Sequence, residues 1–505
     1  MKKTLLAFAI LALLCACGDT NSSSSSSEIS SSISSEKESS EIPTEVTDFT
    51  FATNEMGALE INEDGGITIT KYTCKRGSTV NVVIPEEYKP LGQKESYKIT
   101  RIAPRAFIFA GGIKTIKFSK NIKYCAEGAF AGCSTLLSFD VDENNEVFSS
   151  RNDNLYSKDG KKLICGPNGK EEVLIDSSTE EIGPSAFSNN RTKKFVIEEG
   201  VKVIGDRAFE KTKVAKEVTI PNSVTTLGEY VFANSDIDSI NLGTGISVLP
   251  SYTIYQCPNL DSLVVPGNIK TIKYSAIGDN QHMTSLTLNE GVETIEGYGI
   301  SFNTNLKDLS LPTSLRIIGT CAFIGSPSLV DVVVPEGVKS IGDGAFSHST
   351  ALERLTISST VEEIGQGITQ YCTSFEGFVV SDNNQYFTLS DSSLYSKDMK
   401  RLLAVPQHYG EPGYHTYNIP EGIEQIDNFV FNYSVRISKV VIPSSVKSIG
   451  AAIFANGAVS EVQYLGSTSD WANITKSAIF EDVDTSYNAM SSVTIINCSD
   501  GDVEA

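Results

Sequence analysis

The chain has 505 residues, and its apolar content of 40% is enough to bury a large core. Its 62 acidic residues outnumber its 41 basic residues and give a formal net charge of −21. An acidic surface repels phosphate groups, so the composition argues against nucleic acid as a partner and against electrostatic attachment to anionic lipid.

The first 17 residues have the features of a secretion signal. Lys2 and Lys3 form a positive end, and the apolar run over residues 5–14 is too short to span a bilayer. The sequence LCAC at positions 14–17 resembles the lipobox of bacterial lipoproteins. This resemblance implies that Cys17 carries a lipid and becomes the mature N-terminus. An ordinary signal peptide that is cleaved nearby is the alternative.

Residues 18–46 are rich in serine, with six consecutive serines at positions 22–27. Such a segment buries too little apolar area to offset the entropy lost on ordering. We therefore predict a disordered tether, which holds the next domain about 30 Å from the membrane.

Residues 47–100 precede a repeat and show strand-like alternation, for example at Ile67 and Ile69 and again at Val80 and Val82. A solenoid needs capped ends. We predict that this segment is a degenerate coil that forms the N-terminal cap.

A unit of 22 or 23 residues repeats in blocks over residues 101–465. It is clearest where IGTCAF at 318–323 returns as IGDGAF at 341–346. The last residue of this hexapeptide is called the anchor here, and the successive anchors are Phe107, Phe130, Phe187, Phe209, Phe232, Ile254, Ile277, Ile300, Phe323, Phe346, Thr369, Phe431 and Phe454. At Thr369 the neighbouring Ile368 can supply the apolar side chain. A period of this size predicts a solenoid, in which each coil buries its apolar side chains against its neighbours.

Each unit contains a short strand whose apolar residues alternate, as Leu263 and Val265 do, and a proline such as Pro266 often follows. The positions between the core residues are uncharged and mostly β-branched: Thr219, Asn241, Val264, Thr287, Ser310, Val333, Thr356, Val379 and Val441. Strand propensity alone produces such a stripe, and a flat binding face is the second interpretation.

The position three residues after each anchor is almost always small and usually able to hydrogen-bond. Cys133, Cys257 and Cys372 share this position with asparagine, serine and threonine in other units. We predict a stacked column that satisfies backbone groups turned inward at a bend.

The pattern I-G-x-x-A-F-x-x-C-x-x-L-x-x-V-x-I-P resembles the BspA-like leucine-rich-repeat family of bacterial surface proteins. The resemblance covers about residues 101–465 and implies a β-rich solenoid of 22–23-residue coils. Parallel strands are expected on one face, with short strands or irregular turns on the other. It also implies attachment to host proteins or to other cells.

Two insertions, at about 142–169 and 382–413, share a design. Each predicts a hairpin, with turns centred on Asp159 and Asp398. An extra hairpin on the sheet edge is the structural interpretation, and a ligand contact is the alternative. Residues 466–505 are predicted to form the C-terminal cap. Residues 466–474 resemble a terminal motif of the family, which implies that Trp471 closes the core. We expect the last strand at residues 493–498.

The sequence offers no set of residues for catalysis or metal binding. Apart from Cys15 and Cys17 there are eight cysteines, none in a Cys-x-x-Cys pair, and their repeat positions predict separation along the axis. Buried thiols are expected, and a Cys125–Cys133 disulfide is the alternative. We find no nucleophile motif, metalloprotease motif or phosphate loop. We therefore expect no enzyme activity, no cofactor and no metal.

The densest aromatic stretch is residues 408–417. Its candidate ligand-binding residues are Tyr409, Tyr414 and Tyr417, which could stack on sugar rings or anchor a protein partner. The alternative is that they pack the second insertion onto the array.

These observations predict a lipid-anchored, surface-displayed monomer that adheres to an extracellular protein. If the cell has two membranes, the outer one is expected. A glycan-capturing protein and a non-catalytic scaffold of an envelope complex are the alternatives.

Overall fold

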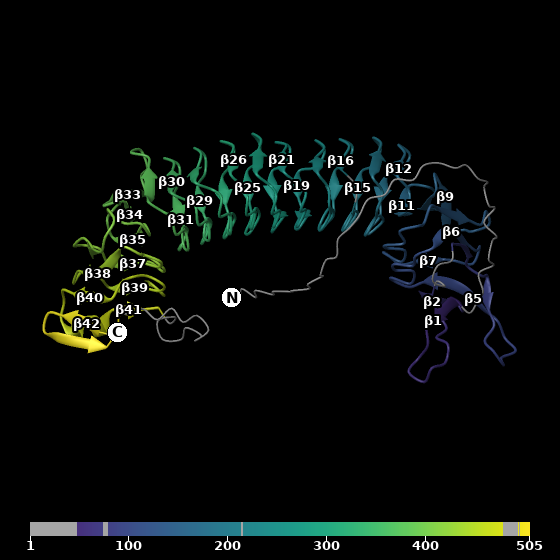
Figure 1. Cartoon of the computed structure of the whole chain (residues 1–505), viewed down its shortest axis with the longest axis horizontal. Coiled ribbons are helices and arrows are strands. Elements are labelled where there is room, and N and C mark those ends of the chain that lie inside the picture. Colours follow the sequence, from purple (N-terminus) through teal and green to yellow (C-terminus); the bar gives the residue numbers. More distant parts are fainter. Residues whose placement is uncertain (1–47, 74–78, 214–215, 478–492, 494, 505) are drawn as a thin grey trace, which may run out of the picture. The chain divides into compact units, whose positions relative to one another are not determined.

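The computed structural model describes residues 48–73, 79–213, 216–477, 493 and 495–504. Cys17 and the serine-rich segment 18–46 lie outside the described residues. The described residues form stacked coils, most of which have one main strand and one short strand (Figure 1).

The main strands pair in parallel with those of neighbouring coils, in short sheets. Leu263 pairs with Leu286, which pairs with Leu309, so the register advances by one 23-residue repeat per coil. The main strands are β3 (Val80–Val83), β6 (Ile113–Phe118), β8 (Ser138–Val141), β12 (Glu172–Ile175), β14 (Lys194–Ile197), β16 (Glu217–Thr219), β18 (Ser239–Asn241), β21 (Ser262–Val265), β24 (Ser285–Leu288), β26 (Asp308–Ser310), β28 (Asp331–Val333), β30 (Arg354–Ile357), β32 (Gly377–Val380), β36 (His415–Asn418), β38 (Ile437–Ile442), β40 (Glu461–Tyr464) and β42 (Ile495–Cys498).

The short strands form a second row of parallel pairs. They are β7 (Tyr124–Cys125), β13 (Glu181–Ile182), β15 (Val203–Ile204), β17 (Thr226–Leu227), β19 (Val248–Leu249), β22 (Thr271–Ile272), β25 (Thr294–Ile295), β27 (Ile317–Ile318), β29 (Ser340–Ile341), β31 (Glu363–Ile364), β37 (Gln425–Ile426), β39 (Ser448–Ile449) and β41 (Thr475–Lys476). The expected solenoid with two strand faces is therefore confirmed.

All the anchors are buried, including Thr369 beside the equally buried Ile368. Phenylalanine anchors of adjacent coils stack: the rings of Phe323 and Phe346 lie 5.4 Å apart at 1°. The core divides into three clusters, and the divisions fall at the two insertions. Stacking thus extends one apolar core from coil to coil within each block.

Two residues of each repeat adopt the left-handed backbone conformation, one two positions before the anchor and one two positions after it. Around Phe232 these are Tyr230, with φ 57°, and Asn234, with φ 58°. A residue other than glycine pays about 1–2 kcal/mol in this conformation. The turn recovers hydrogen bonds to the next coil: the backbone N–H groups of Phe232 and Asn234 donate to the carbonyls of Thr253 and Tyr255 at 2.9 and 2.8 Å.

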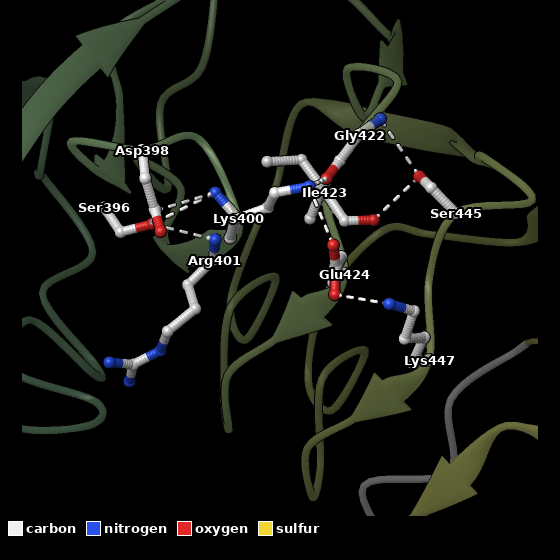
Figure 2. Close-up of polar contacts among 9 residues, drawn as sticks. All are labelled: Ser396, Asp398, Lys400, Arg401, Gly422, Ile423, Glu424, Ser445 and Lys447. Carbon is white, nitrogen blue, oxygen red and sulfur yellow. Dashed lines mark hydrogen bonds and ion pairs between the residues drawn. The ribbon is translucent and has the colours of Figure 1, made fainter.

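Some coils are also joined through a Glu-Gly-Val/Ile sequence. In Figure 2 the N–H of Gly422 donates to Oγ of Ser445 at 3.1 Å, and this hydroxyl donates to the carbonyl of Ile423 at 2.8 Å. The same pair of bonds joins Gly200 and Val201 to Ser223, Gly291 and Val292 to Ser314, and Gly337 and Val338 to Thr360. All four glycines have positive φ, so this contact requires glycine.

Both insertions contain the expected antiparallel hairpin, and each gains an additional strand before it. The first comprises β9 (Phe148–Arg151), β10 (Asn154–Ser157) and β11 (Lys162–Cys165). The second comprises β33 (Phe387–Ser390), β34 (Ser393–Ser396) and β35 (Arg401–Ala404). Asp159 and Asp398 sit in the hairpin turns, where each accepts a hydrogen bond from the serine two residues earlier at 2.6 Å.

The N-terminal segment contains β1 (Phe49–Phe51), β2 (Ile67–Tyr72), β4 (Glu87–Tyr88) and β5 (Tyr97–Ile102), and β2 and β5 pair in parallel as coil strands do. At the other end, Trp471 in α1 (Thr468–Asn473) is buried and packs on Tyr464 at 5.3 Å. The expectation that the last strand ends near 498 is wrong. A further strand, β43 (Gly501–Glu504), turns back to pair with β42, because Ser499 and Asp500 lie in a turn between them.

Candidate binding surfaces

The main strands present an uncharged column of side chains, called the strand stripe here. Its side chains alternate with buried ones along each strand, as Val333 does between Val332 and Val334, and Val333 is 64% exposed. From β12 to β32 the stripe comprises Leu174, Val196, Thr219, Asn241, Val264, Thr287, Ser310, Val333, Thr356 and Val379. The expected alternation with core residues is confirmed for the stripe from Thr219 to Val379 and for Val441, and Leu174 and Val196 extend it.

Charged side chains stand on one side of the strand stripe in some coils. Two positions earlier on the strands these are Glu217, Asp308, Asp331 and Arg354, whereas β18, β21 and β24 have serine at this position. Arg354 pairs with Asp331 of the preceding coil at 3.0 Å. An uncharged centre with a polar border is the usual composition of a protein interface.

The three tyrosines expected to bind a ligand do not form one exposed surface. Tyr417 is 1% exposed and shares a 2.7 Å hydrogen bond with Tyr395 inside the core. Tyr409 packs edge-on against Tyr417 at 4.9 Å, whereas Tyr414 is 77% exposed. Tyr417 belongs to main strand β36, whose alternation turns its ring inward.

The column that follows the anchors links adjacent coils. The side-chain amides of Asn280 and Asn303 each donate to the carbonyl of the preceding coil's anchor, Ile254 or Ile277, at 3.0 Å. The thiols of Cys257 and Cys372 do the same to Phe232 and Phe346, each at 3.2 Å. The predicted role of this column is confirmed, and cysteine is one interchangeable member of it.

One set of cysteines lies close together. Burial, and then the nearby thiols of Cys125 and Cys133, raise the pKa of Cys165 well above its usual value. The repeat does not place Cys165, which lies on β11 of the first insertion, and both Cys165 and Cys125 pack against the same core cluster. Cys125 is a free thiol in this structure.

Among the described residues, no group of three His, Cys, Asp or Glu side chains is placed to hold a metal ion. No helix within these same ranges is long and apolar enough to cross a bilayer.

A row of tyrosines lies on the turns that join short strands to main strands, and sequence reasoning missed it. This tyrosine row comprises Tyr230, Tyr252, Tyr274 and Tyr298, one in each of four successive coils. Tyr230 and Tyr252 stack at 4.5 Å and 7°. Three members occupy the left-handed position before the anchor, but Tyr274 is displaced by one residue. Because of this displacement, the tyrosines do not recur at one fixed repeat position in the sequence. A comparison of the repeats that allowed a shift of one residue would reveal the row.

Solved structures of similar fold come from several bacteria. A leucine-rich repeat protein from Bacteroides ovatus ATCC 8483 is 18% identical and has a TM-score of 0.46; the match covers 90% of this chain and 99% of that chain. A leucine rich cell surface protein from Faecalibacterium prausnitzii A2-165 is 18% identical, with a TM-score of 0.41 and coverage of 86% and 99%. The pneumococcal vaccine antigen PcpA is 19% identical, with a TM-score of 0.42 and coverage of 77% and 93%.

No curated protein matches the chain significantly. The family model described as "BspA type Leucine rich repeat region (6 copies)" matches residues 44–155, 180–305, 301–403 and 409–497. These ranges span most of the chain and include the coils whose anchors, columns and strand register are described above. The chain belongs to the BspA-type leucine-rich-repeat family.

Proposed function

We propose that this protein is lipid-anchored through Cys17 at the bacterial cell surface and adheres to an extracellular protein of a host or a neighbouring cell. In a cell with two membranes, the anchor lies in the outer one. The protein acts as a non-catalytic monomer, and the strand stripe is its binding face.

The observation that carries this proposal is the strand stripe. Ten main strands, β12 to β32, present uncharged side chains in one column, and valines such as Val264, Val333 and Val379 are exposed within it. Exposed apolar side chains that recur in one column favour a contact surface over a merely solvated one. The charged side chains beside the stripe supply polar contacts in some coils.

The test measures binding of the full chain, in a neutral detergent, to immobilised host matrix proteins, serum proteins and intact cells. Val333→Asp places a charge in the centre of the strand stripe without disturbing a buried side chain. The matched control is Ile317→Asp, because Ile317 is also an exposed apolar residue but lies on short strand β27.

We expect the unmodified chain to bind at least one of these targets. Because hot-spot residues carry most of an interface's energy, Val333→Asp should weaken that binding about tenfold or more. Ile317→Asp should bind as the unmodified chain does. Equal binding by both variants would show that the strand stripe is not the binding face.

A further inference from the structure

The tyrosine row changes geometry at the coils of Ile254 and Ile277. There the turn segments form an extra pair of parallel strands, β20 (Ile254–Tyr255) and β23 (Ile277–Gly278). Within the described ranges, no other pair of anchors lies in such strands. The backbone here makes the same two bonds to the next coil as the other turns do, for example from the N–H groups of Ile254 and Gln256 to the carbonyls of Ala276 and Gly278 at 2.8 and 2.9 Å.

Two rings at this place are not parallel to the ring of Tyr252: Tyr274, a member of the tyrosine row, and Tyr255, which lies after the anchor and is not a member. The ring of Tyr255 lies at 86° to that of Tyr252, with centroids 5.3 Å apart. The ring of Tyr274 lies at 60° to that of Tyr252, and Tyr274 is 43% exposed. In a regular stack each ring covers its neighbour's face, so this break leaves aromatic surface open to a ligand.

Gly278 makes room for one of these rings. A Cβ atom at Gly278 would stand 3.0 Å from Cδ2 of Tyr255, which is closer than ordinary van der Waals contact. The ring therefore rests against bare backbone of the next coil. A tyrosine held in this way is a fixed flat surface rather than a side chain free to enter a partner's pocket.

Polar groups beside the rings have hydrogen-bonding capacity, and their cation, Lys273, already has a carboxylate partner. The carboxylate of Asp279 accepts from the side-chain amides of Gln256 at 2.7 Å and Gln281 at 3.3 Å. Lys273 forms an ion pair with Glu296 at 2.6 Å. The cation at this place is thus already paired, so an anionic ligand gains little here, least of all on a chain of net charge −21.

We propose that Tyr255 and Tyr274, with Gln256, Asp279 and Gln281, form a binding site for a neutral glycan. Sugar C–H groups pack on the fixed aromatic rings, while sugar hydroxyls hydrogen-bond to the carboxylate and the two amides. This site lies on the turns and is separate from the strand stripe. The glycan proposal therefore does not depend on the proposal of protein adhesion.

The test is affinity electrophoresis of the full chain in a neutral detergent. The gels contain soluble starch, galactomannan, hydroxyethyl cellulose, laminarin or yeast mannan, and gels with heparin or polygalacturonate serve as the anionic comparison. The variants are Tyr274→Ala, Gln256→Ala and, as a matched control, Tyr386→Ala. Tyr386 is 47% exposed but belongs to the second insertion.

We expect at least one neutral polysaccharide to retard the chain and neither anionic polysaccharide to do so. Tyr274→Ala should weaken that binding about tenfold or more, as loss of a central aromatic contact does. Gln256→Ala should weaken it less, and Tyr386→Ala should leave it unchanged. Circular dichroism that matches the unmodified chain shows that each variant is folded.

Three results would overturn the proposal: no retardation by any neutral polysaccharide, retardation by the anionic ones alone, or undiminished binding by Tyr274→Ala. If Tyr274→Ala instead lost binding to an immobilised protein, this surface would be a protein-docking site. Val333→Asp should bind the neutral polysaccharide normally, which separates this site from the strand stripe.

Discussion

The backbone N–H of Asn280 donates to the side-chain oxygen of Asn303, 23 residues later, at 3.0 Å. The amide of Asn303 in turn donates to the carbonyl of Ile277 in the coil of Asn280. One side chain therefore satisfies two buried backbone groups of the preceding coil, which fixes the register of adjacent coils at a full repeat.

Replacing Asn303 by alanine should destabilise the chain by about 2–6 kcal/mol, because it leaves two buried backbone groups unsatisfied and each costs about 1–3 kcal/mol. The control is Asn305→Ala, since Asn305 is exposed and makes one bond to the carbonyl of Gln281. Urea unfolding followed by circular dichroism measures both changes. Equal losses for the two variants would contradict the role given to the column.

Replacing alanine by glycine should change the stability in opposite directions at the neighbouring residues Ala451 and Ala452. Ala452 has φ 50°, so Ala452→Gly should relieve about 1–2 kcal/mol of backbone strain, less about 0.5–1 kcal/mol for the entropy of glycine. Ala451 is buried without positive φ, so Ala451→Gly should destabilise by about 1 kcal/mol. Thermal unfolding of both variants decides this, and a destabilising Ala452→Gly would count against strain at this position.

Glu424 should remain ionised in acid. Its carboxylate accepts hydrogen bonds from Lys400 at 2.7 Å and Lys447 at 2.6 Å (Figure 2), which lowers its pKa from 4.5 to about 2. Because the folded-state pKa is depressed, these contacts stabilise the fold fully above about pH 4.5. That contribution is lost as the pH falls towards 2.

Carbon-13 NMR of glutamate-labelled protein, with Glu424→Gln to assign the signal, measures this pKa. In the double variant Lys400→Met, Lys447→Met the pKa should return towards 4.5. Lys439→Met is the control, because Lys439 pairs with Glu461 instead. An unshifted pKa in the double variant would refute the ion-pair explanation.

Lipid attachment is tested at the two neighbouring cysteines. Cells fed an alkyne-tagged fatty acid should label the unmodified chain and the Cys15→Ser variant, and both should fractionate with the membrane. Cys17→Ser should carry no label and should leave the membrane fraction. Labelling of Cys17→Ser would place the lipid elsewhere.

Apolar periodicity made the solenoid predictable. Burial of Phe323 and Phe346 and the alternation around Val333 follow from the spacing of apolar residues, which reports directly on what faces the core. The column that contains Asn303 was also predictable, because its members are almost all small and most can hydrogen-bond.

Other structural features could not be predicted from the sequence. The left-handed positions hold residues as different as Arg207, Tyr230 and Ala452, because backbone hydrogen bonds to the next coil, not side-chain type, impose the conformation. Tyr417 seemed a ligand contact because local composition does not reveal which face of β36 a side chain occupies. The Glu-Gly-Val/Ile sequence itself could be recognised. Its contact could not, because the serine or threonine that it bonds to lies in the next coil, a full repeat later in the sequence.

The central claim is that the repeats are equivalent coils of one stacked array, and deletion of one coil tests it most directly. Removal of residues 304–326 joins Asn303 to Pro327 and preserves the column position that Ser326 held. Removal of residues 304–314 breaks the register. Circular dichroism and urea unfolding should show that the 23-residue deletion keeps the native β-spectrum and a cooperative transition, whereas the 11-residue deletion does not. If the two deletions were equally damaging, or equally harmless, the coils would not be interchangeable units and the account would fail.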